Sequence, residues 1–150
     1  MDELDLKIIQ ILSKDADITT TAIKKEINLS IPAINKRIQT LKEKGMIKQF
    51  TVLTDGKKVG KPITAYVFVV LESSSCVEPL IKYINTDVDI LECSAITGEY
   101  DCLLKICAES IEKLDEKVMY LKKYKGIIKT NTMLSLNTYK YSPTIMPNCI

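Results

Sequence analysis

The sequence predicts an α+β protein of two domains, a helical domain over residues 1–61 and a βαββαβ domain over residues 62–150. Apolar side chains recur at helical spacing through the first 45 residues, whereas from residue 62 onward β-branched and aromatic runs alternate with helical stripes. The charge divides in the same way. Residues 1–61 carry 12 Lys and Arg against 8 Asp and Glu, a net of +4, and residues 62–150 carry 9 against 11, a net of −2. A polyanionic partner is therefore expected for the first domain alone.

The first two helices are predicted from their caps and apolar faces. Asp2 caps the first helix with Asp5 at its third position, and one face of that helix carries Leu4, Ile8, Ile11 and Leu12. The second helix begins at Thr19 or Thr20 and buries Ile23 and Ile27. It ends near Asn28, a residue type that tolerates the left-handed backbone with which many helices close.

A third helix follows after a tight turn. Ser30 offers its N-cap, Pro32 is permitted in the first turn, and the helix runs from Ile31 to about Lys44 before Gly45 ends it. Its buried stripe is predicted to hold Ile31, Ile34, Ile38 and Leu41. Two short helices joined by such a turn are typical of a helix-turn-helix.

The exposed face of the third helix predicts contact with the major groove of double-stranded DNA. Lys36 points away from the buried stripe, and Arg37 at the rim is expected to meet phosphates. The full set of expected DNA-binding residues is Ser30, Pro32, Ala33, Asn35, Lys36, Arg37, Gln39 and Thr40. The alternative is a solvated amphipathic helix in an all-α interaction module, because a basic face is often only a soluble one.

Beyond Met46 the pattern becomes extended and is interrupted by polar residues. The stretch 46–53 is predicted to form a wing or a two-stranded linker, and residues 55–58 read as a turn. Residues 57–62, with one glycine, three lysines and a proline, mark the predicted domain boundary.

The second domain reads as strand, helix, strand, strand, helix, strand. The predicted segments are a strand over residues 63–71, a helix marked by Val77, Leu80, Ile81 and Ile84, strands over 90–97 and 100–107, a helix after Ser110 marked by Ile111, Leu114, Val118 and Leu121, and a strand over 127–139. This order is that of the ferredoxin-like fold, in which both helices cover one face of a four-stranded sheet.

Both faces of the predicted sheet are apolar. Tyr66, Phe68 and Val70 are as apolar as the residues that alternate with them, and Leu103 and Cys107 oppose an equally apolar set. A second copy of the sheet is the simplest cover, so the sequence predicts a homodimer, which Asp at Val67 or Val69 is expected to disrupt.

Several classes of function are disfavoured by composition. The chain has no histidine, and its five cysteines, at positions 76, 93, 102, 107 and 149, form no C-x-x-C pair, so catalytic triads, disulfide frameworks, metal sites and cofactors are not expected. Cys102 and Cys107 fall on opposite faces of one strand. No apolar run reaches the length of a membrane helix and no signal peptide is apparent, so a cytoplasmic protein is expected.

Three groups of residues together resemble the Lrp/AsnC (feast/famine) transcription regulators. They are Asp2-x-x-Asp5-x-x-Ile8-Ile9-x-x-Leu12; Leu29-Ser30 followed by Arg37-Ile38-x-x-Leu41 and Gly45-x-Ile47; and Thr97-Gly98-x-Tyr100-Asp101. The resemblance implies a winged helix-turn-helix with a linker, a ferredoxin-like effector-binding domain, dimers that assemble into octamers or other even oligomers, and amino acids as effectors. Lys24 and Asn28 depart from the alanine and glycine that are usual in the family.

The same resemblance implies an effector site at the turn after the third predicted segment of the second domain. Backbone at Gly98 can approach a ligand, Tyr100 can wall a pocket, and Asp101 is expected to pair with an α-ammonium group. Thr130, Asn131 and Thr132 on the last strand complete the expected effector-binding set. Without the resemblance, residues 98–101 read as an ordinary hairpin turn, with Asp101 bonding local amides.

Two alternatives to an effector-responsive regulator stay open from the sequence. Proteins resembling this family include siroheme decarboxylases, but those rely on histidine and arginine, and this chain has Arg37 alone. The other alternative is an architectural protein that binds DNA through multivalent oligomers without any effector.

Overall fold

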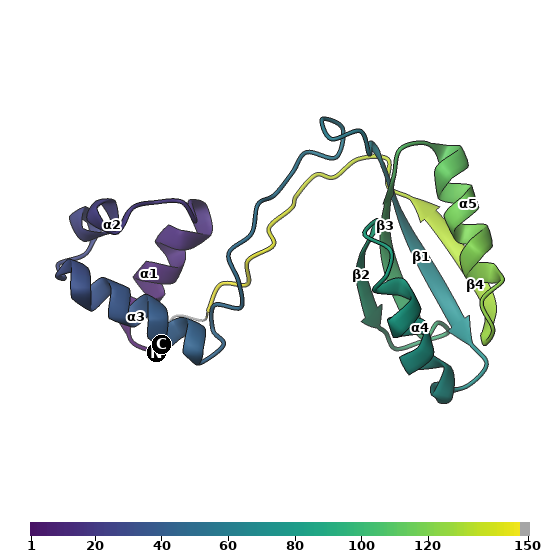
Figure 1. Cartoon of the computed structure of the whole chain (residues 1–150), viewed down its shortest axis with the longest axis horizontal. Helices are drawn as coiled ribbons and strands as arrows, with labels where there is room; N and C mark the ends of the chain where they lie inside the picture. The colour runs from purple at the N-terminus through teal and green to yellow at the C-terminus, as the bar shows by residue number, and fades with distance from the viewer. Residues whose placement is uncertain (148–150) are drawn as a thin grey trace. The chain divides into compact units, whose positions relative to one another are not determined.

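The computed structural model describes residues 1–147, which divide into two compact units (Figure 1). One unit combines Met1–Leu53 with the segment that starts at Lys140, and the other is Thr54–Tyr139. This division differs from a single boundary at residue 62, since the segment 54–61 groups with the second unit. Lys61, at the end of that segment, forms an ion pair with Asp89.

The first unit contains α1 (Glu3–Lys14), α2 (Thr20–Glu26) and α3 (Ile31–Glu43). Each begins at a predicted cap: Asp2 and Asp5 form a reciprocal capping box, Thr19 accepts from the Ala22 amide, and Ser30 accepts from the Ala33 amide. None of the helices within residues 1–147 is long and apolar enough to cross a membrane.

The end of α2 differs from the expectation. No residue other than glycine has a positive φ in the described chain, so Asn28 does not close the helix in the left-handed conformation. The chain instead leaves α2 through extended Ile27, whose side chain is 4% exposed. The Leu29 amide then donates to the Ile27 carbonyl, and burial of Ile27 ends the helix.

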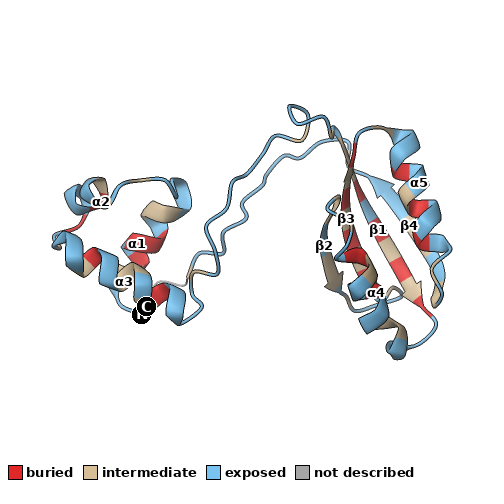
Figure 2. Ribbon diagram, viewed as in Figure 1, coloured by how far each residue is buried: buried red, intermediate tan, exposed pale blue. Residues whose placement is uncertain are grey.

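Residues from the three helices, together with Ile27 just after α2, form the core of this unit (Figure 2). They are Ile8, Ile9, Ile23, Ile27, Ile34 and Leu41. The predicted inclusion of Ile31 in the buried stripe was wrong, because this first helical residue is 36% exposed. Ile34 and Leu41 therefore anchor α3 and leave the opposite face to solvent.

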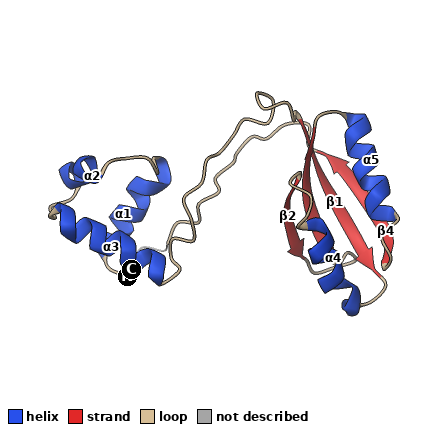
Figure 3. Cartoon of the chain, viewed as in Figure 1, coloured by secondary structure: helices blue, strands red, loops and turns tan. Residues whose placement is uncertain are grey.

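The predicted wing has no strand of its own in the described chain. Figure 3 draws the path from α3 to the first strand as loop, with turns at 56–60. Phe50, Val52 and Leu53 are exposed along it. An extended stretch was expected here, but its backbone forms no ladder with any other segment of residues 1–147.

The second unit has the predicted βαββαβ order. Its main elements are β1 (Ile63–Leu71), α4 (Val77–Ile84), β2 (Ile90–Ala95), β3 (Cys102–Ala108), α5 (Ile111–Lys122) and β4 (Ile127–Leu134), with a short 3₁₀ turn, η1 (Ser74–Cys76), before α4. The antiparallel sheet has the strand order β2-β3-β1-β4. The last strand ends at Leu134, five residues earlier than expected.

Helices α4 and α5 cover one face of this sheet (Figure 1). Val67 and Val69 have no exposed surface on the covered face, so the choice of these positions to probe a dimer was wrong. Strand registers assign the other face, called here the open face, to Thr64, Tyr66, Phe68, Val70, Glu92, Ser94, Leu103, Lys105, Cys107, Lys129, Asn131 and Met133.

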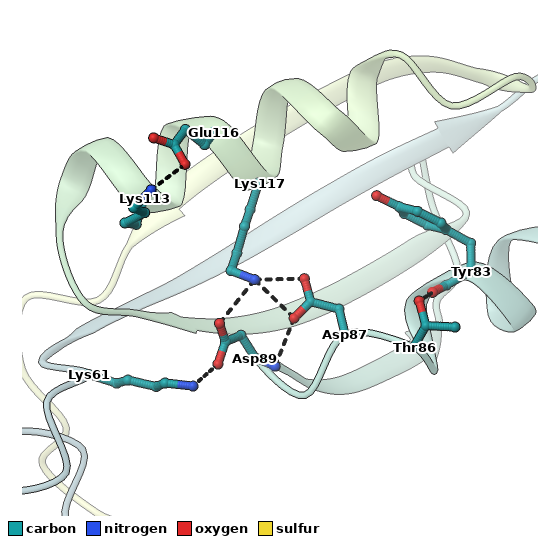
Figure 4. Close-up of polar contacts among 8 residues, drawn as sticks. All are labelled: Lys61, Tyr83, Thr86, Asp87, Asp89, Lys113, Glu116 and Lys117. Atoms are coloured by element: carbon teal, nitrogen blue, oxygen red, sulfur yellow. Dashed lines mark hydrogen bonds and ion pairs between the residues drawn. The ribbon is translucent and has the colours of Figure 1, made fainter.

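A network of ion pairs joins the α4–β2 loop to α5 and to the segment before β1 (Figure 4). The Lys117 ammonium lies 2.7 Å from Asp87 Oδ2 and 3.0 Å from Asp89 Oδ2, while Lys61 pairs with the other oxygen of Asp89. These contacts, led by the Lys61 bond, hold the pKa of Asp89 below its usual value.

We predict that Asp89→Asn lowers the free energy of unfolding at pH 7 by on the order of 1 kcal/mol, because two lysines lose a shared anion. A carboxylate with a depressed pKa stabilises the fold above its unfolded pKa, about 3.9, and loses that contribution as the pH falls further. Urea titrations should therefore show the gap between parent and variant narrowing below about pH 4. Glu116→Gln, which removes an exposed pair with Lys113, is the control and should change little; an equal effect there contradicts the prediction.

Candidate DNA-binding surface and effector site

The expected DNA-binding residues gather on the side of α3 away from the core. Pro32, Asn35, Lys36 and Gln39 are exposed, and Ala33 and Thr40 are half-buried beside them. Ser30 serves as the N-cap, with its Oγ 3.4 Å from the Ala33 amide nitrogen. The ammonium group of Lys36 has no hydrogen-bond or ion-pair partner within residues 1–147, which leaves its charge available to an outside anion or base.

Arg37 differs from the rest of this set because the fold already engages its guanidinium. Its NH1 nitrogen lies 2.8 Å from Asp2 Oδ2 and 2.7 Å from Asp5 Oδ1, and its side chain is 30% exposed. Hydrogen bonds to Asp5 and then Asp2 raise the pKa of Arg37. The pKa of Asp2 is lowered, first by the Asp5 amide and then by Arg37. Arg37 thus ties α3 to the N-terminus of α1.

Other polar side chains of α3 also have partners. Asn35 Oδ1 accepts from the Thr20 hydroxyl of α2 at 3.0 Å. Gln39 Nε2 donates to Glu43 Oε1 at 3.0 Å, and the Thr40 hydroxyl donates to the Lys36 carbonyl. Lys24, which departs from the small residue usual in the family, is exposed on α2 and is absent from the core.

The predicted effector turn lies between β2 and β3. Gly98 has φ +117°, a conformation that side chains rarely adopt, and the space around its α-carbon is open. The Tyr100 ring lies 5.1 Å from the Phe68 ring, and its hydroxyl accepts from Asn131 Nδ2 at 3.3 Å. The Lys129 ammonium stands 5.6 Å from the same ring.

Phe68 and Lys129 were missed as neighbours of this turn. Register with β1 identifies both: Phe68 pairs with Asn131, and Lys129 pairs with Val70. The pairing of β1 with β4 joins segments about sixty residues apart, so spacing along the chain carried no signal for it.

Asp101 has a structural role that the hairpin alternative only partly anticipated. Its Oδ2 accepts the Leu71 amide at 2.7 Å, and its own amide donates to the Val69 carbonyl. The carboxylate therefore bonds β1 at the irregularity between Val70 and Leu71. Its Oδ1 has no hydrogen-bond partner in the described chain, so this oxygen can still pair with a cation.

The expected trio on β4 is divided between the two faces of the sheet. Asn131 lies on the open face with Tyr100, whereas Thr130 and Thr132 pair with Val69 and Val67 on the covered face. The Thr130 hydroxyl is buried without a partner in the described chain. A separate groove of about 470 Å³ lies beside Lys117, Tyr83 and Tyr120 and contains none of the expected effector residues.

The cysteines lie in separate environments. Cys102 is buried on the covered face and Cys107 lies on the open face, as the strand period predicted. Burial raises the pKa of Cys93 to about 11, so its thiol is protonated at neutral pH. Cys149 lies outside the described residues.

Two family models match the chain. A winged helix-turn-helix DNA-binding model matches residues 1–48, and the Lrp/AsnC ligand binding domain matches residues 64–145. The chain belongs to the Lrp/AsnC family. It is a transcription regulator with a helix-turn-helix and an AsnC-type ligand-binding domain, and not an enzyme, which removes the siroheme decarboxylase alternative.

Related Lrp/AsnC proteins match over most of the chain. The regulator FL11 of Pyrococcus furiosus is 32% identical over 143 residues, covering 93% of this chain and 92% of the relative. The structure of Bacillus subtilis LrpC is 31% identical, with a TM-score of 0.84 and coverage of 93% and 97%. A regulator from Neisseria meningitidis in complex with L-Met has the same fold, at 22% identity, a TM-score of 0.92 and coverage of 97% and 96%.

Proposed function

We propose that this regulator binds double-stranded DNA sequence-specifically through α3, as a homodimer that assembles into a higher even oligomer, and responds to an amino acid. The observation that carries DNA reading is the exposed face of α3, where the unpaired ammonium of Lys36 lies beside the carboxamides of Asn35 and Gln39. These groups suit base edges in the major groove. Arg37 stabilises this surface through its ion pairs with Asp2 and Asp5.

The composition of the open face is the evidence for the proposed dimer. Phe68, Val70 and Leu103 form its centre and are only half-buried in the single chain, while Glu92 and Lys129 lie toward its edges. An apolar centre with a polar rim is the anatomy of a protein interface. A second copy presents the same surface, so two chains can cover each other's open face about a two-fold axis.

An amino-acid effector is supported by two relatives that were solved with L-Met, one from Neisseria meningitidis and one from Mycobacterium tuberculosis. In this chain the turn itself supplies the Gly98 backbone and the Tyr100 ring, and the side-chain amide of Asn131 lies beside them. Lys129 has the charge to pair with a carboxylate, and Asp101 Oδ1 can pair with an ammonium group. Thr130 and Thr132 are left out of the proposed site because they lie on the covered face.

We predict that Lys36→Ala weakens DNA binding by about 1 to 3 kcal/mol without lowering thermal stability, because Lys36 has no structural partner. Arg37→Ala should lower thermal stability as well, since it frees two carboxylates of α1. Fluorescence anisotropy with a selected duplex and a random duplex, alongside melting curves, measures both. Lys7→Ala removes an equal charge from an exposed position on α1; if it weakens specific binding as much as Lys36→Ala, α3 does not read the sequence.

For assembly, we predict that Phe68→Asp converts the dimer to monomer, because an unpaired charge would be buried at the centre of the interface. Val88→Asp is the matched control, since Val88 is 84% exposed in the α4–β2 loop. Sedimentation velocity separates the outcomes. A parent chain that sediments as a monomer, or a Phe68→Asp variant that keeps the parent's mass, contradicts the proposed interface.

For effector sensing, we predict that L-methionine or another of the twenty amino acids raises the melting temperature of the parent, because a ligand of the folded state alone stabilises it. Asp101→Asn should abolish that shift while preserving the fold, because the amide oxygen can still accept from Leu71. Asp115→Asn on exposed α5 is the control. Equal calorimetric affinities in parent and Asp101→Asn would remove Asp101 from the site, and no shift with any amino acid would favour the architectural alternative.

A further inference from the structure

The base preference of a recognition helix depends on which polar atoms its own fold has already occupied. Asn35 carries one acceptor oxygen and one amino group with two donors. The hydroxyl of Thr20, a half-buried residue at the first position of α2, donates to that oxygen at 3.0 Å. Because the carboxamide is planar, holding its oxygen toward Thr20 turns the amino group to the other side, where it has no partner within residues 1–147.

This occupancy bears on how Asn35 can meet a base. Adenine offers an acceptor at N7 and a donor at N6, so the usual pairing of asparagine with adenine needs both halves of the carboxamide. Guanine offers two acceptors, N7 and O6, to which an amino group alone can donate. With Asn35 Oδ1 held toward Thr20, the carboxamide meets the base with its amino group, so an adenine N6 amino group would face a donor.

We propose that Thr20 is a specificity-determining residue: its hydroxyl holds Asn35 so that α3 presents donors at this position, selecting guanine and rejecting adenine. The inference deepens the proposed function, on which it rests. Thr20 acts through Asn35 and needs no contact of its own with a base. A base pair with matched hydrogen bonds is favoured over a mismatched one by roughly five-fold to more than a hundred-fold.

Gln39 provides an internal reference on the same face of α3. Its Nε2 donates one of its two hydrogens to Glu43, a residue of the same helix, so its oxygen and its second N–H remain available. The two amides thus differ: Asn35 presents donors, whereas Gln39 keeps both an acceptor and a donor. Thr20 contacts only the first, so its removal should leave the base read by Gln39 unchanged.

The experiment is selection of a random duplex DNA library with the full chain, comparing the parent with Thr20→Val, Thr21→Val and Asn35→Ala. Asn35→Ala identifies the motif position that Asn35 reads by flattening it. The parent should favour guanine there and disfavour adenine at least five-fold, and Thr20→Val, which keeps shape but loses the donor, should accept adenine. Thr21→Val, on the exposed neighbouring position, should keep the parent's motif.

Two further variants separate orientation from folding. Thr20→Ser restores the hydroxyl and should restore rejection of adenine. Asn35→Asp keeps the Thr20 bond but presents an acceptor outward, so the preference should move to cytosine, whose N4 amino group donates. This variant tests the proposal even if Thr20→Val does not fold, which its melting curve reports.

The inference is overturned if the parent prefers adenine at the Asn35 position, if Asn35→Ala leaves every position unchanged, or if folded Thr20→Val keeps the parent's discrimination. Failure of the proposed function has a different signature, since the parent would then enrich no sequence at all.

Discussion

Two helices can cover only one face of a four-stranded sheet, and the rest of the second unit follows from this constraint. The covered face takes the fully buried residues of β1 and β3, which leaves Tyr66, Phe68 and Val70 to the open face. Tyr100 packs on Phe68 there, so the turn that carries Gly98 is anchored to the same surface that we propose as the dimer interface. The proposed ligand site and the proposed dimer interface therefore share side chains.

In the first unit, polar contacts decide what α3 can offer. Buried Ile34 and Leu41 pack α3 against the core of the unit. Arg37 bonds Asp2 and Asp5 at the start of α1, and Thr20 orients Asn35. A residue near a recognition surface can thus act by contact or by holding a neighbour. Arg37 and Thr20 belong to the second kind, whereas Lys36 has no role within the described chain that competes with DNA.

The helix caps, the strand 63–71 and the βαββαβ order were predictable because each depends on local spacing and capping chemistry. The choice of covered face was not, since a strand that is apolar on both sides carries no mark of which side the helices take; Val67 was misjudged for that reason. The hydrogen-bond partners of Arg37 and Asp101 could not be predicted from the sequence either, because long-range hydrogen bonds leave no local pattern. Asn28 was misread because burial of Ile27, a tertiary effect, ends α2 instead.

The tyrosines give this protein a natural optical reporter. The chain has seven tyrosines and no tryptophan, so tyrosine emission is not lost by energy transfer to an indole. Tyr100 lies close to Phe68 and to the Lys129 ammonium on the open face, apart from the stacked group of Tyr83, Tyr120 and Tyr124 near α4 and α5. A single tryptophan introduced at Phe68 would accept excitation energy from Tyr100. Ligand binding or assembly on that face would then shift emission between the tyrosine and tryptophan wavelengths.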